Sequence, residues 1–132
     1  MKKVFLLLVC ALFALTSFSQ KFIKVERMTT LQYSDYKQKW EETETTYPSS
    51  IYVMIKGSEV IITSSYEQRI YTYGSPEKTN YTTHTVYTWR ALDKEGMRLS
   101  FMIKIFNNGS VIYMFIYKGV GVEYLMDMSS NN

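Results

Sequence analysis

MRLSFMIKIFNNGSVIYMFIY, residues 97–117, carries the clearest structural signal in the sequence. Apolar side chains occupy alternate positions over residues 97–105, and most of the residues between them are polar. A period of two is typical of a β-strand with one buried face. Asn107-Asn108-Gly109 then predicts a tight turn. Residues 111–118 are apolar at both parities, which predicts a central strand covered on both faces.

The same alternation continues upstream between short turn signals. Gly57-Ser58 separates two β-rich runs and predicts a hairpin over residues 51–65, because glycine accepts a positive φ without penalty. Gly74-Ser75-Pro76 is expected to end the strand that precedes it. Asp93-Lys94-Glu95-Gly96 places aspartate first and glycine last, as is typical of a four-residue turn. The other predicted strands cover residues 22–33, 68–73, 79–90 and 122–126, and residues 129–132 form a polar tail.

Residues 34–46 admit two interpretations. Tyr36 and Trp40 are four positions apart, so one or two helical turns compete with a loop that enters a polar edge strand over residues 40–46. Threonines in the second half favour the strand. In a strand, Glu42 and Glu44 would share a face. We interpret the acidic run as a solvated edge that discourages strand addition.

Composition supports an all-β chain. All twelve tyrosines lie beyond position 20, where Ala91 is the only alanine, so strand formers dominate over helix formers. Strands joined by short links pair as an antiparallel meander. A chain of this size protects its edges by closing into a barrel or by folding into two packed sheets. The sequence therefore predicts an antiparallel meander of about eight strands that forms a small barrel or a barrel-like sandwich.

The N-terminal residues predict export. Lys2-Lys3 precede an uncharged run over residues 4–15, which is too short to span ~30 Å of hydrocarbon, so we expect no retained transmembrane segment. Ser17-Phe18-Ser19 has the small-x-small pattern of a secretory cleavage site. We expect residues 1–19 to be a cleaved signal peptide of bacterial type. Residues 20–132 should form a single all-β domain in the periplasm or outside the cell.

Charge and cysteine usage exclude several function classes. Cys10 is the only cysteine and lies within the apolar run, so the exported part has no thiol for a disulfide or a Cys–His pair. The net charge of +3 falls to +1 without Lys2-Lys3. No basic cluster follows, so nothing favours binding to nucleic acid.

Catalytic and metal-binding patterns are also missing from the sequence. His84 is the only histidine, and its strand neighbours Thr82 and Val86 offer no carboxylate, so we interpret it as a partly exposed strand residue. No nucleophile motif or glycine-rich phosphate loop occurs. The sequence predicts no enzyme activity, no cofactor and no metal site.

A stripe of aromatic side chains is the candidate ligand-binding feature. Tyr81, Tyr87 and Trp89 would share one face of the strand over residues 79–90, and Tyr71 and Tyr73 lie on the strand before it. Rings provide contact area and hydroxyls provide direction, which suits an amphipathic ligand. We expect a monomeric binding module for a small or amphipathic ligand. The alternative is an envelope interaction protein or inhibitor that acts through a strand edge or the tyrosine-rich face.

The predicted outline resembles that of lipocalin-like barrels, which are exported meanders of this size or larger. Their glycine-x-tryptophan signature near the mature N-terminus is absent, because Trp40 follows Lys37, Gln38 and Lys39, and no glycine occurs over residues 20–56. The resemblance is one of architecture, which does not determine function. No family is assigned on this basis.

Overall fold

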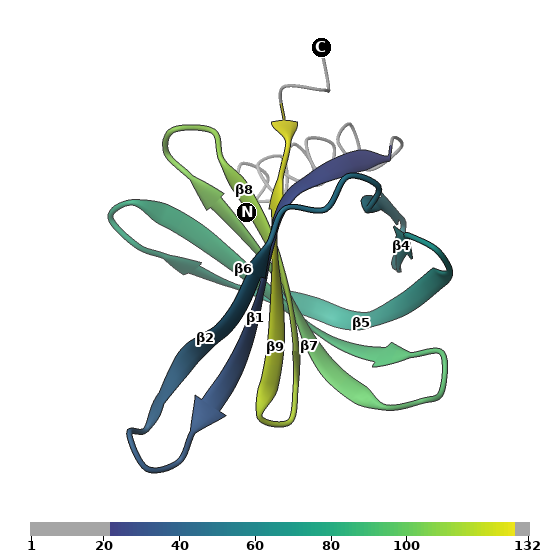
Figure 1. Cartoon of the computed structure of the whole chain (residues 1–132). Coiled ribbons are helices and arrows are strands. Elements are labelled where there is room, and N and C mark those ends of the chain that lie inside the picture. Colours follow the sequence, from purple (N-terminus) through teal and green to yellow (C-terminus); the bar gives the residue numbers. More distant parts are fainter. Residues whose placement is uncertain (1–21, 129–132) are drawn as a thin grey trace, which may run out of the picture.

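The computed structural model describes residues 22–128, which form nine β-strands and no helix (Figure 1). The predicted signal peptide and the polar tail lie outside these residues. The strands are β1 (Ile23–Ser34), β2 (Lys39–Thr46), β3 (Tyr52–Lys56), β4 (Glu59–Thr63), β5 (Glu67–Asn80), β6 (His84–Asp93), β7 (Arg98–Phe106), β8 (Val111–Tyr117) and β9 (Val120–Met126).

Eight of the strands close into an antiparallel barrel. Each strand from β3 to β8 pairs with the next, and β9 pairs with residues 25–32 of β1. The other edge of β1 meets β3 through Ile23 and Lys24, where the Val25 N–H also donates to the Ile51 carbonyl at 2.8 Å. The fold is therefore a barrel and not a barrel-like sandwich. In the part of the chain that the structure describes, β2 pairs only with β1, and the β1–β2 hairpin extends to the lower left in Figure 1.

The barrel interior is filled by the side chains whose alternation predicted the strands. Phe101 is among the largest buried side chains, 2% exposed, and its ring stacks on Phe115 at 5.1 Å and on Trp89 at 5.6 Å between centroids. Such contacts add to the burial of apolar area that stabilises a core. The buried core comprises Ile23, Val25, Val53, Val60, Ile62, Ile70, Ala91, Leu99, Phe101, Ile103, Val111, Tyr113, Phe115, Tyr124 and Met126.

Strand β8 is apolar on both faces, as its sequence indicates. Tyr113 and Phe115 are buried in the core, and Met114 on the opposite face is only 6% exposed. Its neighbours on that face, Ile112 and Ile116, remain half-buried. The prediction of cover on both faces therefore holds for the middle of the strand only.

Two predicted strand boundaries are wrong. Gly74-Ser75-Pro76 does not end a strand, since β5 continues to Asn80 through a bulge between Tyr73 and Glu77. The bulge leaves Pro76 outside the pairing ladder, where its missing N–H costs nothing. The strand predicted over residues 79–90 is divided, because the Tyr81 N–H donates to the His84 carbonyl at 2.8 Å and turns the chain between β5 and β6.

The ambiguous residues 34–46 form a hairpin arm, which confirms the edge-strand interpretation. Gln38 adopts a left-handed conformation, φ 52°, in the turn before β2. A bulge then shifts the register, so that Leu31 lies opposite Glu42 and the adjacent Thr30 lies opposite Glu44. Adjacent residues of a strand point to opposite faces. The prediction that Glu42 and Glu44 share a face is therefore wrong.

Candidate functional site

The bulge in β5 shapes a groove in the outer wall of the barrel. Tyr73 lies opposite Arg90 and Glu77 lies opposite Thr88, so three residues of β5 face Trp89 alone. Gly74 takes a positive φ of 74°, which a residue with a side chain rarely adopts. The resulting groove has a volume of about 440 Å³. It is lined by Tyr73, Gly74, Ser75, Glu77, Thr88, Trp89, Arg90 and Ser100.

The groove combines aromatic surface with opposite charges. Tyr73 is 43% exposed and offers its ring and hydroxyl to solvent. Glu77 and Arg90 carry opposite charges, and within residues 22–128 neither side chain forms an ion pair. An unpaired guanidinium presents its donors to a carboxylate, a phosphate or a sugar hydroxyl. The arrangement is suited to a ligand with a flat apolar part and polar ends.

The five aromatic residues predicted to bind ligand do not form one surface. Tyr73 and Trp89 line the groove. Tyr87 stacks on Trp89 at 6.2 Å between ring centroids, and Lys78 Nζ lies 5.8 Å from the centre of the Tyr87 ring. Tyr71 pairs across the sheet with Glu59 and Leu92 and is not among the residues that line the groove.

Tyr81 lies in a separate aromatic stack with His84. The Tyr81 and His84 rings lie 4.7 Å apart between centroids, and His84 stacks in turn on Phe106 at 4.8 Å. The His84 Nδ1 atom lies 2.8 Å from the Thr83 hydroxyl. The Asn107 side-chain amide donates to the Thr82 carbonyl at 2.9 Å and joins the two neighbouring turns. The histidine therefore has a hydroxyl partner rather than a carboxylate.

A second hollow, of about 240 Å³, lies near the turn between β6 and β7. The Tyr117 hydroxyl donates to Asp93 Oδ2 at 3.2 Å, and Asp93 Oδ1 accepts the backbone N–H groups of Glu95 and Met97. Burial, together with the charge and the hydrogen bond of the Asp93 carboxylate, raises the pKa of Tyr117 to about 12. The neutral Tyr117 phenol is the hydrogen-bond donor in this contact. The Tyr117 hydroxyl and the Asp93 carboxylate are therefore both engaged in hydrogen bonds that hold the turn.

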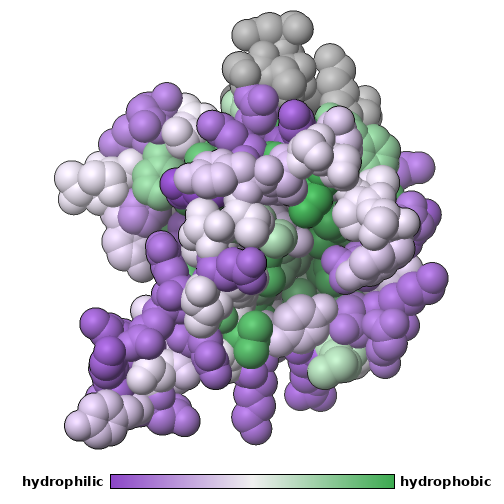
Figure 2. All heavy atoms as spheres, in the orientation of Figure 1, coloured by the Kyte–Doolittle hydropathy of each residue, from purple (hydrophilic) through white to green (hydrophobic). Residues whose placement is uncertain are grey.

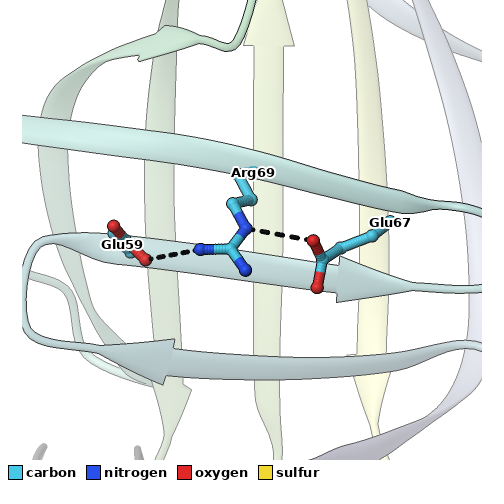
Figure 3. A network of polar contacts seen from close by, with 3 residues as sticks. All are labelled: Glu59, Glu67 and Arg69. Atoms are coloured by element: carbon cyan, nitrogen blue, oxygen red, sulfur yellow. Dashed lines mark hydrogen bonds and ion pairs between the residues drawn. The ribbon is translucent and has the colours of Figure 1, made fainter.

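An ion-pair network stabilises the outer face of β4 and β5 beside this hollow. Figure 3 shows the Arg69 guanidinium between two carboxylates. Its Nε donates to Glu67 at 3.0 Å, and its Nη1 donates to Glu59 at 3.3 Å. The hydrogen bond that Arg69 donates to Glu67 raises the pKa of the Arg69 guanidinium. Arg69 forms ion pairs with both Glu59 and Glu67, so it has a structural role on this face.

Sequence reasoning missed the polar residues of the groove. Glu77, Arg90 and Ser100 come from three different strands, so their proximity depends on register. One local signal was available: a Gly-Ser-Pro cluster followed by further strand-forming residues is also typical of a bulge.

No family model, curated protein or solved structure matches the chain. Among residues 22–128, no helix is long and apolar enough to cross a membrane. The same residues contain no group of three or more His, Cys, Asp or Glu side chains that could hold a metal ion. The class defined by the geometry is an eight-stranded antiparallel barrel with an external hairpin and an amphipathic groove in its wall.

Proposed function

We propose that this protein is an exported binding module that holds a small amphipathic ligand in the groove beside the β5 bulge. The observation that carries the proposal is the groove itself, which joins the exposed Tyr73 ring to an unpaired cation and an unpaired anion. Its volume of about 440 Å³ falls within the range of roughly 300–1,000 Å³ that is usual for small-molecule sites.

The groove also has a rigid base. Trp89, one of the residues that line the groove, packs against the core and stacks on Phe101, so this part of the groove wall is anchored in the barrel interior. A preformed site loses little conformational entropy when a ligand binds. Export is supported by the predicted signal peptide, and it agrees with the absence of cysteine from residues 20–132.

Native mass spectrometry of protein purified from its own host tests the proposal. We expect a bound small molecule that is lost under denaturing conditions. Tyr73→Ala should reduce its retention, whereas Tyr36→Ala should not, because Tyr36 is 95% exposed in the turn between β1 and β2. No retained molecule, or equal retention by the two variants, contradicts the proposal.

Tryptophan fluorescence gives an independent measurement. The chain has two tryptophans, so Trp40→Phe leaves Trp89 as the only one. The released molecule should change the emission of Trp89 when it is added back to this variant. An unchanged spectrum at saturating ligand would place the binding site elsewhere.

A further inference from the structure

The β1–β2 hairpin leaves one strand edge unused. The barrel closes through β1, β3 and β9, so β2 is not needed for closure. In the described part of the chain, β2 pairs with β1 along residues 39–46 and has no strand on its other side. Most of its side chains are exposed. Figure 2 shows a mostly hydrophilic surface at the lower left, where Figure 1 places this hairpin.

The register shows which backbone groups face outward from β2. The Tyr33 N–H donates to Gly119 on the β9 side, so the alternate residues Gln32 and Thr30 direct their backbone groups toward β2. Gln32 pairs with Glu41, and Thr30 pairs with Glu44. Trp40, Glu42 and Thr45 therefore turn their N–H and C=O groups toward the open side. An edge of this kind is a template for another extended chain.

We propose that the open edge of β2 binds an extended, arginine- or lysine-rich segment of a partner protein by strand addition. The charge of the strand indicates the partner. Lys37 Nζ pairs with Glu41 Oε1 at 3.1 Å, whereas Glu42 and Glu44 form no ion pair with any residue in the range 22–128. The bulge directs these two carboxylates to opposite faces of the hairpin. A basic strand would meet a carboxylate on either face.

A second copy of this chain does not fit the same edge. Antiparallel pairing of β2 with itself, centred on Glu42 and Thr43, would bring Glu41 opposite Glu44 twice. Like charges directly opposite each other destabilise a strand pair. The glutamates thus select against self-association, and they favour a partner with complementary charge.

An exposed aromatic pair lies at one end of the edge. Trp40 and Tyr33 pack edge to face at 5.5 Å between centroids, and they are 39% and 37% exposed. They lie on the same face as Glu42, because Tyr33 pairs with Trp40 and Leu31 pairs with Glu42. A guanidinium over the indole ring gains a cation–π contact. This contact favours arginine over lysine at the end of the added strand.

The test uses the full chain and a synthetic heptapeptide that alternates arginine and valine, with a glutamate–valine heptapeptide as the control. We expect the arginine peptide to bind and the glutamate peptide not to bind. Thr45→Pro removes one outward N–H and should weaken binding about tenfold, because one interstrand hydrogen bond is lost. Thr45→Val keeps that N–H and should bind as the wild type does. Replacing Glu42 and Glu44 together by glutamine should also weaken binding.

Amide hydrogen exchange keeps the proposal testable if Thr45→Pro does not fold. In the wild type, exchange of the Trp40 and Thr45 N–H groups should slow when the arginine peptide is added. The proposal is overturned if the wild type does not bind, if Thr45→Pro binds like Thr45→Val, or if the exchange of both N–H groups is unchanged. Tyr73→Ala should leave peptide binding intact, so this result is independent of the groove.

Discussion

The barrel should lose free energy of unfolding at alkaline pH, and replacing Tyr113 with phenylalanine should remove a defined part of that loss. Tyr113 is 4% exposed and packs against Phe101 at 5.8 Å between ring centroids. Burial raises its pKa to about 12, whereas a tyrosine in the unfolded chain ionises near pH ~10. The folded state therefore keeps the phenol proton over a pH range in which the unfolded state has lost it.

The sign and size of the effect follow from linkage. The contribution of Tyr113 to the free energy of unfolding is fully present below pH ~10 and is lost as the pH rises toward the folded pKa. At about 1.4 kcal/mol for each unit of pKa difference, the full loss is about 2.7 kcal/mol and is reached only above the folded pKa. About 2 kcal/mol of it is lost between pH ~10 and ~12, because the phenol is half ionised in the unfolded chain at the lower limit and half ionised in the folded chain at the upper limit. Tyr113→Phe keeps the ring and its contact with Phe101 but has no proton to lose.

Urea unfolding followed by far-UV circular dichroism, repeated from neutral to strongly alkaline pH, measures this difference. The wild type should lose about 2 kcal/mol more than Tyr113→Phe between pH ~10 and ~12, because every other titrating group is common to both proteins. Tyr36→Phe is the control, since Tyr36 is 95% exposed, and its curve should follow the wild type. Parallel curves for the wild type and Tyr113→Phe would refute the reasoning.

Three further experiments test the barrel itself. Phe101→Ala should lower the free energy of unfolding by about 3–5 kcal/mol in a urea titration, and a loss below ~1 kcal/mol would mean that the core repacks around the cavity. Gly109→Ala should cost about 1 kcal/mol in thermal unfolding because Gly109 has φ 92°, whereas Gly121→Ala, which meets only ordinary contacts, should cost less. Lys104 and Glu123, 3.7 Å apart, should couple by roughly 0.5 kcal/mol in a double-mutant cycle that weakens with salt; no coupling at low salt contradicts this.

Local signals in the sequence predict the hairpins well. The alternation over residues 97–105 and the Asn-Asn-Gly turn correspond to β7, its turn and β8. The four-residue turn is also confirmed, since the Gly96 N–H donates to the Asp93 carbonyl at 3.0 Å and Gly96 has φ 82°. In these cases one short segment contains all the residues that determine the structure.

Features that depend on distant partners were not predictable in the same way. Gly74-Ser75-Pro76 has the composition of a strand end, and only pairing with β6 distinguishes an end from a bulge. For the same reason the groove could be predicted only in part. Tyr73 and Trp89 belong to the predicted site, whereas Arg90 and Glu77 do not. Tyr81 lies outside β6, because the turn before His84 interrupts the alternation on which its shared face with Tyr87 and Trp89 is predicted.

The pairing of β1 with β9, which closes the barrel, sets the order in which the chain can fold. Val25 lies opposite Met126, roughly 100 positions further along the chain, whereas most other neighbours in the ring are joined by short turns. The hairpins can form early, but this last pairing must wait for the C-terminal strand and for a slow search over a long loop. Until then β1 and β8 both expose unpaired edges, so a chain cut short before Val120 should aggregate rather than persist as a smaller barrel.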